Sequence, residues 1–374
     1  MKIVLDARIP NAGGMYSYSR ALLQGIMEID HDNQYTVIYD KTHGKLGLKG
    51  CHEIVVESDN PWRYLLWNNT RLPELLKIEN ADIYHSFKQV FLRQSRTKKI
   101  LTLHSAYNIM PDFRQYYNLQ ERLYWAPMLK AGARTADSII SVSYFDSRNL
   151  SKILSISPEK IHVTQLAADQ RFKIIKDSNE LKTVRKNLNL PERFIVYVGT
   201  IYPIKNVKNI IKIYHRITQS LGKDIKLVIV GRKGWGDKVV TQKIKELNLE
   251  SQVIFTGHQW DYLPHIYTMA ELLLFPSYYE AFCAPPLEAL SCGTPVVASN
   301  RGGIPEVVEN CGLLKDPDDV AGLTASCLRI LTDSCFKTNL IKCGLEHVKK
   351  FTWQKCVEST IKVYIKTFET LSVP

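Results

Sequence analysis

Two glutamates, Glu280 and Glu288, lie eight positions apart in the stretch YYEAFCAPPLEALSCGTPVVAS, residues 278–299. A carboxylate can accept hydrogen bonds from two hydroxyl groups at once, so one glutamate could hold a ribose diol and the other the hydroxyls of a sugar. Pro285 and Pro286 suit the first turn of a helix, whose free amide groups could bind phosphates between the two acids. The stretch therefore predicts a site for a sugar linked to a nucleoside diphosphate. The alternative is a pair of solvated glutamates.

Two further features could bind the phosphates of such a ligand. Gly13 and Gly14 precede a helical pattern that begins near Met15, and consecutive glycines there let backbone amides approach a phosphate. Lys205 lies in a turn after the strand predicted at 195–199, where its ammonium group could reach a diphosphate. The helix dipole disfavours a lysine at that position, which favours a functional role. The alternatives are a steric strand-to-helix turn for the glycines and a solvated side chain for the lysine.

The composition excludes several classes of protein. With 45% hydrophobic and 23% charged residues, the chain has the composition of a globular protein. The formal net charge is +12, and residues 1–170 hold 21 basic and 17 acidic residues, so the surplus is spread along the chain. We therefore expect no nucleic-acid partner. The stretch GRKGWG at 231–236 lacks the G-x-G-x-x-G spacing of dinucleotide-binding enzymes, which disfavours a nicotinamide oxidoreductase.

The eight cysteines form no C-x-x-C pair and show no zinc-like spacing with histidines. We therefore expect no bound metal and no disulfide framework, but reduced core thiols in a cytosolic protein. No apolar run reaches the roughly 18 to 20 residues of a membrane span. Asp6 and Arg8 interrupt the N-terminal apolar run, which argues against a secretion signal. A cytoplasmic location is the expectation.

The elements that must position these residues follow an alternating pattern. Short β-branched runs alternate with amphipathic segments such as 206–221 and 237–248, which is typical of an α/β protein with doubly wound parallel sheets. The predicted strands are 2–7, 35–40, 52–58, 81–86, 99–105, 137–143, 193–200, 225–231, 252–257, 271–277 and 294–299.

The 374 residues suit two domains of about 150 to 200 residues each. We predict an N-terminal Rossmann-like domain at 1–170, a linker or domain edge at 171–192, and a C-terminal Rossmann-like domain at 193–351. The last segment, 352–374, is predicted as a helix that returns to the first domain. Ligands of such sheets bind outside the carboxyl ends of the strands, so we expect the site in a deep cleft between the two domains.

Several ordered motifs carry a resemblance to a known family. The stretch EAFCAPPLEALSCGTPVVASNRGGIPEVV, residues 280–308, resembles the Glu-x7-Glu segment of the retaining GT-B glycosyltransferases of family 4. YVGTIYPIKN at 197–206, LTLHSAY at 101–107, ADSIISVSYFDSRNL at 136–150 and PEKIHVTQLAAD at 158–169 resemble further segments of the family. The similarity runs from Gly13 to about Thr352. Within residues 197–206, the pair GT followed by P-x-K-N is similar to the motif of the family members that use GDP-mannose.

The resemblance implies roles for individual residues. Glu280 would hold hydroxyls of the donor sugar, and Glu288 would hold the nucleotide ribose. Lys205 would neutralise the leaving diphosphate, and His104 would contact the donor sugar near the reaction centre. Backbone amides would add hydrogen bonds to the donor at Gly13, Gly14, Phe282, Cys283 and Ala284. Such enzymes retain the configuration of the anomeric carbon, and they use no metal cofactor because basic side chains and helix amides balance the diphosphate charge.

The chain departs from the family pattern at several of these positions. Ala281 and Cys283 stand where the family often has glycines on either side of the phenylalanine, so we predict backbone strain there. His104 is followed by serine instead of the frequent aspartate. The basic residue that often precedes the lysine is replaced by Ile204 and, earlier in the turn, by Thr200. Either donor affinity is modest, or another cation approaches the diphosphate, with Arg232 and Arg301 as the candidates.

The acceptor side is less determined by the sequence. Tryptophans alternate with basic residues in NPWRYLLWNNTRL, residues 60–72, and basic residues recur in FLRQSRTKK, residues 91–99. An interfacial helix has such a composition, which would suit a lipid-linked acceptor and peripheral contact with the inner face of a membrane. Alternatively, Trp62 and Trp67 are core or interdomain aromatics.

The leading interpretation is an enzyme that moves a hexose, mannose from GDP-mannose, to a hydroxyl of a glycan or lipid-linked glycan. One alternative is a transferase that depends on UDP-glucose, UDP-galactose or UDP-N-acetylglucosamine. The other is a GT-B scaffold that binds a glycan or a partner without turnover.

Overall fold

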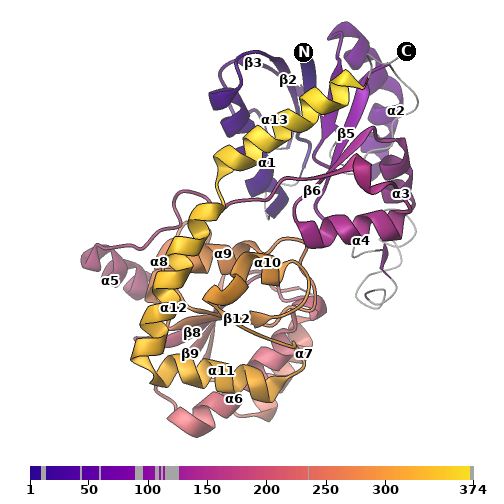
Figure 1. Cartoon of the computed structure of the whole chain (residues 1–374). Coiled ribbons are helices and arrows are strands. Elements are labelled where there is room, and N and C mark those ends of the chain that lie inside the picture. The colour runs from indigo at the N-terminus through magenta and orange to yellow at the C-terminus, as the bar shows by residue number, and fades with distance from the viewer. Residues whose placement is uncertain are drawn as a thin grey trace. The chain divides into compact units, whose positions relative to one another are not determined.

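The computed structural model describes residues 1–9, 14–42, 44–58, 60–88, 96–105, 109–110, 113, 126–234 and 236–370. The chain divides into two compact units. The N-terminal unit comprises Met1–Leu166 together with Thr352–Pro374, and the C-terminal unit comprises Ala167–Phe351. Each unit is built from a parallel sheet with helices on both of its faces (Figure 1). The prediction of an α/β chain with two doubly wound, Rossmann-like sheets is confirmed.

The described part of the N-terminal unit has a seven-stranded sheet with the order β3-β2-β1-β4-β5-β6-β7, and all of its neighbouring strands pair in parallel. Its strands are β1 (Lys2–Asp6), β2 (Gln34–Asp40), β3 (Cys51–Val56), β4 (Ile83–Ser86), β5 (Lys98–Leu103), β6 (Ser138–Ser141) and β7 (Ile161–Val163). Its helices are α1 (Gly14–Ile29), α2 (Pro61–Ile78), α3 (Ala126–Thr135), α4 (Tyr144–Leu154), the 3-10 turn η4 (Pro158–Lys160) and α13 (Trp353–Glu369). The order reverses between β1 and β4, which is where ligands of doubly wound sheets bind.

Helix α13 belongs to the N-terminal unit although it is the last element of the chain. It runs beside α1 (Figure 1), and a Cβ atom at Gly25 would lie only 2.7 Å from Val357 Cγ2, so glycine permits this close approach. Two buried hydrogen bonds attach α13 to the sheet: Tyr364 Oη lies 2.7 Å from His85 Nδ1, and Thr367 Oγ1 lies 2.8 Å from Ser138 Oγ. The helix therefore completes the core of the first sheet.

The described part of the C-terminal unit has a six-stranded parallel sheet with the order β10-β9-β8-β11-β12-β13. Its strands are β8 (Phe194–Val198), β9 (Lys226–Val230), β10 (Val253–Gly257), β11 (Leu272–Phe275), β12 (Val296–Ser299) and β13 (Leu313–Lys315). Its helices and 3-10 turns are α5 (Ser178–Asn187), η5 (Pro203–Lys205), α6 (Val207–Leu221), α7 (Asp237–Glu246), α8 (Leu263–Met269), α9 (Ala284–Ser291), α10 (Ile304–Val308), η6 (Glu309–Cys311), α11 (Val320–Thr332), α12 (Ser334–His347) and η7 (Val348–Lys350). Strands β8, β11 and β12 are fully buried because helices cover both faces, which explains their continuous apolar sequences.

Helix α5 lies inside the segment 171–192 that the sequence predicts as a linker or domain edge. Its formation has a local cause, because the Asp177 side chain accepts hydrogen bonds from the amides of Asn179 and Glu180. Arg185 and Lys186 in the last turn complement the helix dipole. The charged composition therefore reflects a solvated, capped helix within the C-terminal unit.

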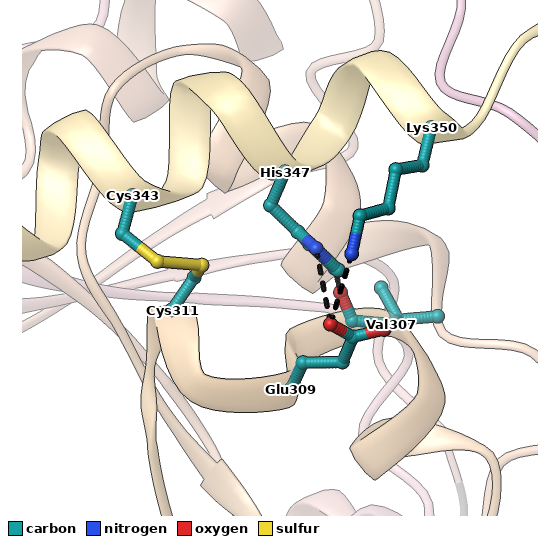
Figure 2. Close-up of a disulfide and its surroundings, with 6 residues drawn as sticks. All are labelled: Val307, Glu309, Cys311, Cys343, His347 and Lys350. Atoms are coloured by element: carbon teal, nitrogen blue, oxygen red, sulfur yellow. Dashed lines mark hydrogen bonds and ion pairs between the residues drawn. A yellow bond between two sulfur atoms is a disulfide. The ribbon is translucent and has the colours of Figure 1, made fainter.

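The expectation of reduced thiols throughout is wrong for one pair of cysteines. Cys311 and Cys343 form a disulfide, with a Cα–Cα distance of 5.2 Å (Figure 2). The pair is 32 positions apart, and helix α12 brings Cys343 to the end of η6, so no short sequence motif could indicate it. Beside it, Glu309 Oε2 lies 3.1 Å from Lys350 Nζ and 3.5 Å from His347 Nδ1. The other six cysteines are free thiols.

Candidate active site

The predicted residues Lys205 and Glu280 form an ion pair at the carboxyl edge of the second sheet. Lys205 ends η5, which follows β8, and Glu280 lies in the loop that follows the neighbouring strand β11. The Lys205 Nζ–Glu280 Oε1 distance is 2.6 Å, and the two side chains are 24% and 12% exposed. A partly exposed cation and carboxylate at this edge can exchange their mutual contact for contacts with a charged, hydroxyl-rich ligand.

Asn206 explains why the lysine turn keeps its shape. Its backbone has φ 57°, a left-handed conformation that asparagine tolerates better than most residues. Its side-chain amide donates to the carbonyl oxygens of Pro276 and Pro317 at 3.1 and 2.9 Å. The amide of Tyr278 donates to the Ile204 carbonyl at 2.9 Å. The loops after β8 and β11 are thus tied together, which positions Lys205 against Glu280.

Glu288, one turn inside α9, is the most buried acid of this region. It is 9% exposed, and one of its carboxylate oxygens, Oε2, accepts a hydrogen bond from Tyr267 Oη at 3.1 Å. Burial raises the pKa of the Glu288 carboxyl to about 7, although the hydrogen bond from Tyr267 and the charge of Arg171 act in the opposite direction. Asp169 adds to the increase. The acid therefore changes charge near neutral pH.

The predicted backbone strain at Ala281 and Cys283 is wrong. Neither residue is among the described non-glycine residues with positive φ, and Cys283 has φ −113°. The close packing falls on the opposite side of the loop: a Cβ atom at Gly303 would lie 2.4 Å from the Ala281 carbonyl oxygen. Gly302 has φ 70°, and the Gly303 amide donates to the Glu280 carbonyl at 2.7 Å. The need for glycine therefore lies at 302 and 303.

The start of α9 has few amide donors of its own. Cys283 precedes the helix, Ala284 is its first residue, and Pro285 and Pro286 carry no N–H group. Phe282 is half-buried, and its ring contacts Phe351 edge-on at 6.2 Å, which anchors the loop. A phosphate at this helix start would therefore depend on the loop amides of Phe282, Cys283 and Ala284, the three that the resemblance implies.

The loops after β8 and β9 lie against each other. A Cβ atom at Gly231 would lie 2.1 Å from the Gly199 carbonyl oxygen, so the two strand ends approach closely because residue 231 is glycine. Thr200 follows directly, and its carbonyl accepts a hydrogen bond from Tyr197 at 3.3 Å. Arg232 is exposed beside this contact, and its carbonyl accepts from the Ile201 amide. Thr200 and Arg232 therefore share the carboxyl edge with Lys205.

The other candidate cation, Arg301, is already engaged. Its guanidinium donates to Asp316 Oδ2 at 2.7 Å from Nη2 and 3.2 Å from Nε. Arg232, on the loop after β9, is thus the freer of the two to meet a phosphate. Among the described residues, no cluster of three or more His, Cys, Asp or Glu side chains could hold a metal ion.

Three predicted residues belong to the N-terminal unit, and the structure describes two of them. His104 follows β5, its ring contacts Tyr18 edge-on at 4.7 Å, and its Nε2 is buried without a hydrogen-bond partner among the described residues. Burial lowers the pKa of this imidazole to about 4, so the ring is neutral at neutral pH and can exchange a hydrogen bond with a hydroxyl. Gly14 begins α1 and is exposed. Gly13 lies outside the described residues.

Sequence reasoning missed two residues that act on Glu288. Tyr267 on α8 holds the Glu288 carboxylate, and Arg171 is the cation that acts on it. Tyr267 stands in an apolar helical pattern that is typical of core positions, and Arg171 lies in the segment interpreted as a linker. Neither position carried a signal that distinguished it from ordinary packing or a solvated charge.

Two family models match the chain, one over most of each unit. Residues 12–170 match the model of Glycosyltransferase Family 4, and residues 179–347 match the model of Glycosyl transferases group 1. The two matched segments together include nearly the whole chain.

Curated relatives are similar over about two thirds of this chain. The chain is 30% identical over 250 residues to the O-antigen chain mannosyltransferase B of Escherichia coli, covering 66% of this chain and 66% of that protein. It is 27% identical over 270 residues to the serotype-specific mannosyltransferase WbdA of Escherichia coli, but this match spans only 31% of that relative.

Solved structures share the fold over the full length. Sucrose-phosphate synthase from Thermosynechococcus elongatus superimposes with a TM-score of 0.80 at 21% identity, with 99% of both chains covered. HepE from Anabaena in complex with UDP superimposes with a TM-score of 0.74 at 17% identity, covering 98% of this chain and 99% of that one.

Proposed function

Because the chain belongs to glycosyltransferase family 4, whose members have the GT-B fold, we propose that it transfers mannose from GDP-mannose to a hydroxyl of a glycan or lipid-linked glycan. The observation that carries the proposal is the Lys205–Glu280 ion pair at the carboxyl edge of β8 and β11, next to the helix that bears Glu288. The cation Lys205, the sugar-binding acid Glu280 and the ribose-binding acid Glu288 then all belong to the C-terminal unit.

In this proposal the bond between the anomeric carbon and the diphosphate oxygen breaks, and the acceptor oxygen forms a bond on the same face. The leaving diphosphate gains negative charge, which Lys205 stabilises once the donor has displaced it from Glu280. Glu280 then accepts hydrogen bonds from sugar hydroxyls, and Glu288 accepts those of the ribose. The acceptor hydroxyl transfers its proton to the leaving phosphate oxygen as that oxygen gains charge. No metal is required for this balance of charges.

The names of the relatives support mannose as the transferred sugar, since two Escherichia coli relatives are mannosyltransferases. The structural neighbour with bound UDP supports a nucleotide donor and favours the alternative in which the base is uracil. The sequence motif at 197–206, with its P-x-K-N turn, favours the guanine nucleotide. A donor comparison therefore decides between the two.

The donor test measures release of GDP or UDP from GDP-mannose, UDP-glucose and UDP-N-acetylglucosamine, with EDTA present to remove divalent metals. We expect GDP release and a rise in Tm with GDP, both lost in Glu288→Ala. Release of UDP without release of GDP would contradict transfer from GDP-mannose and support the alternative of a UDP-sugar-dependent transferase. Binding without release from any donor would indicate the non-catalytic scaffold. The anomeric configuration of the product, measured by NMR, tests retention.

The acceptor side of the proposal includes contact with a membrane surface through α2. This helix buries Tyr64 and Leu72, but Trp62 is 78% exposed and Leu66, one turn later, is 67% exposed. The interpretation of Trp62 as a core aromatic is therefore wrong, whereas Trp67 is half-buried. Exposed Arg63 stands beside the two apolar side chains, a combination that suits an anionic lipid interface. None of the helices described by the structure is long and apolar enough to cross a membrane.

Sedimentation with phosphatidylglycerol vesicles tests this contact. We expect the wild type to bind anionic vesicles but not vesicles of pure phosphatidylcholine. The double variant Trp62→Ser with Leu66→Ser should bind anionic vesicles at least about tenfold more weakly, since each side chain buried in the membrane contributes about 1.5–3 kcal/mol. Val239→Ser, which removes an exposed apolar side chain from α7, serves as the control and should bind normally. Equal binding by the double variant would refute the contact.

A further inference from the structure

The Glu288 carboxylate is buried with little direct compensation. A carboxylate removed from water loses its hydration, and this loss favours the neutral acid unless hydrogen bonds or a counter-charge offset it. Among the described residues, Tyr267 supplies the hydrogen bond to Oε2 at 3.1 Å. A neutral Glu288 would be a poorer acceptor for a ribose diol than a carboxylate. The site therefore needs a cation that favours the ionised form.

Arg171 has the position and the free charge to be that cation. Its guanidinium carbon lies 3.7 Å from the centre of the Trp260 ring and 4.8 Å from the centre of the Phe172 ring, which fixes the group in place. Its Nε and Nη2 are buried and have no hydrogen-bond partner among the described residues. The cation is therefore held by aromatic rings and forms no direct ion pair with another residue that the structure describes.

The unused nitrogens form the edge of the guanidinium that suits a carboxylate. Arg8 uses this edge in the same protein, where its Nε and Nη2 donate to the two carboxylate oxygens of Asp6 at 2.8 and 2.6 Å. At Arg171 the edge remains unsatisfied although acids lie within electrostatic range: Asp169, Asp261 and Glu288. Of these three, Glu288 is the buried one.

Packing connects the two side chains within the C-terminal unit. Phe172, next to Arg171 in sequence, contacts the Tyr267 ring at 6.1 Å, and Tyr267 donates to Glu288. Thr294 fixes the Tyr267 segment, because its hydroxyl donates to the Tyr267 carbonyl at 2.6 Å. A displacement of Arg171 and the aromatic rings that it contacts would therefore also shift Tyr267 and the Glu288 carboxylate.

The other ionisable groups around Glu288 do not supply a positive charge. Asp169, before α5, raises the pKa of the Glu288 carboxyl. Burial raises the pKa of Tyr267 on α8 and of the thiols Cys283 and Cys292 at the two ends of α9, so these groups stay neutral. Asp261, after β10, acts on Arg171. Arg171 is therefore the cation that balances the Glu288 carboxylate among the described neighbours.

We propose that Arg171 is a positioning residue for donor binding: its guanidinium, held against Trp260, favours the ionised form of Glu288, which accepts the ribose hydroxyls of the nucleotide. The inference rests on the proposed function, in which Glu288 holds the ribose. It adds that donor affinity near neutral pH is set by a residue that does not touch the donor.

The first measurement is independent of activity. The protein is labelled with ¹³C at the glutamate carboxyl carbons, the Glu288 resonance is assigned by its absence in Glu288→Gln, and its titration is followed by NMR. We expect a midpoint near 7 in the wild type and a higher midpoint in Arg171→Met. Arg171→Lys, which keeps the charge, should remain close to the wild type. Arg329→Met is the matched control, since Arg329 lies over the Phe336 ring at the same 3.7 Å.

The second measurement is the affinity for GDP between pH 5.5 and 9. We expect wild-type binding to tighten as the pH rises through 7, and Arg171→Met to follow the same curve at higher pH. A midpoint one unit higher weakens binding about fivefold at pH 7 and hardly at pH 9. In Glu288→Gln the profile should be flat, and adding Arg171→Met should change nothing further.

The outcomes separate the inference from the proposed function. An unchanged Glu288 midpoint in both Arg171→Met and Arg171→Gln overturns the role of Arg171, as does a uniform loss of GDP affinity at every pH. If the midpoint moves as expected but the wild type binds neither GDP nor UDP, the proposed function fails and the coupling of the two side chains stands. If Arg171→Met does not fold, Arg171→Gln supplies the neutral variant.

Discussion

Lys205→Met is expected to lower the kcat of sugar transfer by about 10²–10³-fold, because removal of one preorganised group that stabilises developing charge typically costs about 2.7–4 kcal/mol. The lysine is the cation that η5 places at the edge of β8, and methionine keeps much of its length without its charge. The leaving diphosphate would then lose its main side-chain counter-charge. Steady-state kinetics with GDP-mannose, or with the donor that the wild type uses, measures the effect.

The loss must be distinguished from damage to the fold. Lys337→Met is a matched control: Lys337 pairs with Glu271 in the same unit, and those side chains are 26% and 21% exposed, close to the Lys205 pair. Both substitutions leave a partly buried glutamate without its lysine, but Glu271 keeps a second partner, Arg193, whose Nε lies 2.9 Å from Oε1. We therefore expect a small decrease in Tm in each variant, with the smaller one in Lys337→Met. Only Lys205→Met should lose transfer. Equal activity of the two variants would remove Lys205 from the mechanism.

The sheets could be predicted from the sequence more completely than the site. Buried parallel strands such as Phe194–Val198 are continuous β-branched or aromatic runs, and such runs predict buried strands. The strands that escaped prediction are the three-residue edge strands Ile161–Val163 and Leu313–Lys315. A run of three residues has no measurable periodicity, and its pairing depends on the neighbouring strand already being in place.

The candidate site shows the same division between local and non-local information. Glu280 and Glu288 could be predicted because both lie in one short stretch of sequence, eight positions apart, and the two prolines between them indicate the start of a helix. Their environment could not, since Lys205 reaches Glu280 only through the adjacency of β8 and β11 in the sheet. The strain expected at Ala281 is absent because the residue that must be glycine for the close contact is Gly303, on a later loop.

Arg8→Met is expected to reduce the free energy of unfolding of the N-terminal unit by about 3–5 kcal/mol, the usual cost of removing one partner of a buried ion pair. Arg8 and Asp6 are 3% and 0% exposed, and two parallel hydrogen bonds join them at the end of β1, whose last residue is Asp6. Arg8 also donates to Asn68 Oδ1 at 2.6 Å and lies over the rings of Tyr64 and Trp67. The substitution would therefore loosen α2 as well as strand β1.

The pH dependence identifies the cause of this loss. Burial alone would raise the pKa of the Asp6 carboxyl, but Arg8 and the hydroxyl of Tyr84 hold it below its ordinary value. A lowered folded-state pKa gives stability that is present above the unfolded-state pKa and is lost as the pH falls through the folded-state value. Without Arg8 the carboxyl is buried and uncompensated, so the Asp6 pKa should rise above its ordinary value. Arg8→Met should consequently regain part of its deficit on mild acidification, whereas the wild type should not gain.

Hydrogen exchange in urea, read by mass spectrometry, locates the effect within the intact chain. Amides of β1 and β4 should exchange faster in Arg8→Met, and amides of β8 in the C-terminal unit should be unchanged. Arg71→Met is the control, because Arg71 and Glu74 on α2 are 72% and 62% exposed, and such pairs contribute at most about 1 kcal/mol. The double variant Asp6→Asn with Arg8→Met should be more stable than Arg8→Met, since it leaves no buried charge unpaired. If the double variant is the less stable of the two, the cost arises from lost packing of the arginine against Tyr64 and Trp67 and not from the stranded carboxylate.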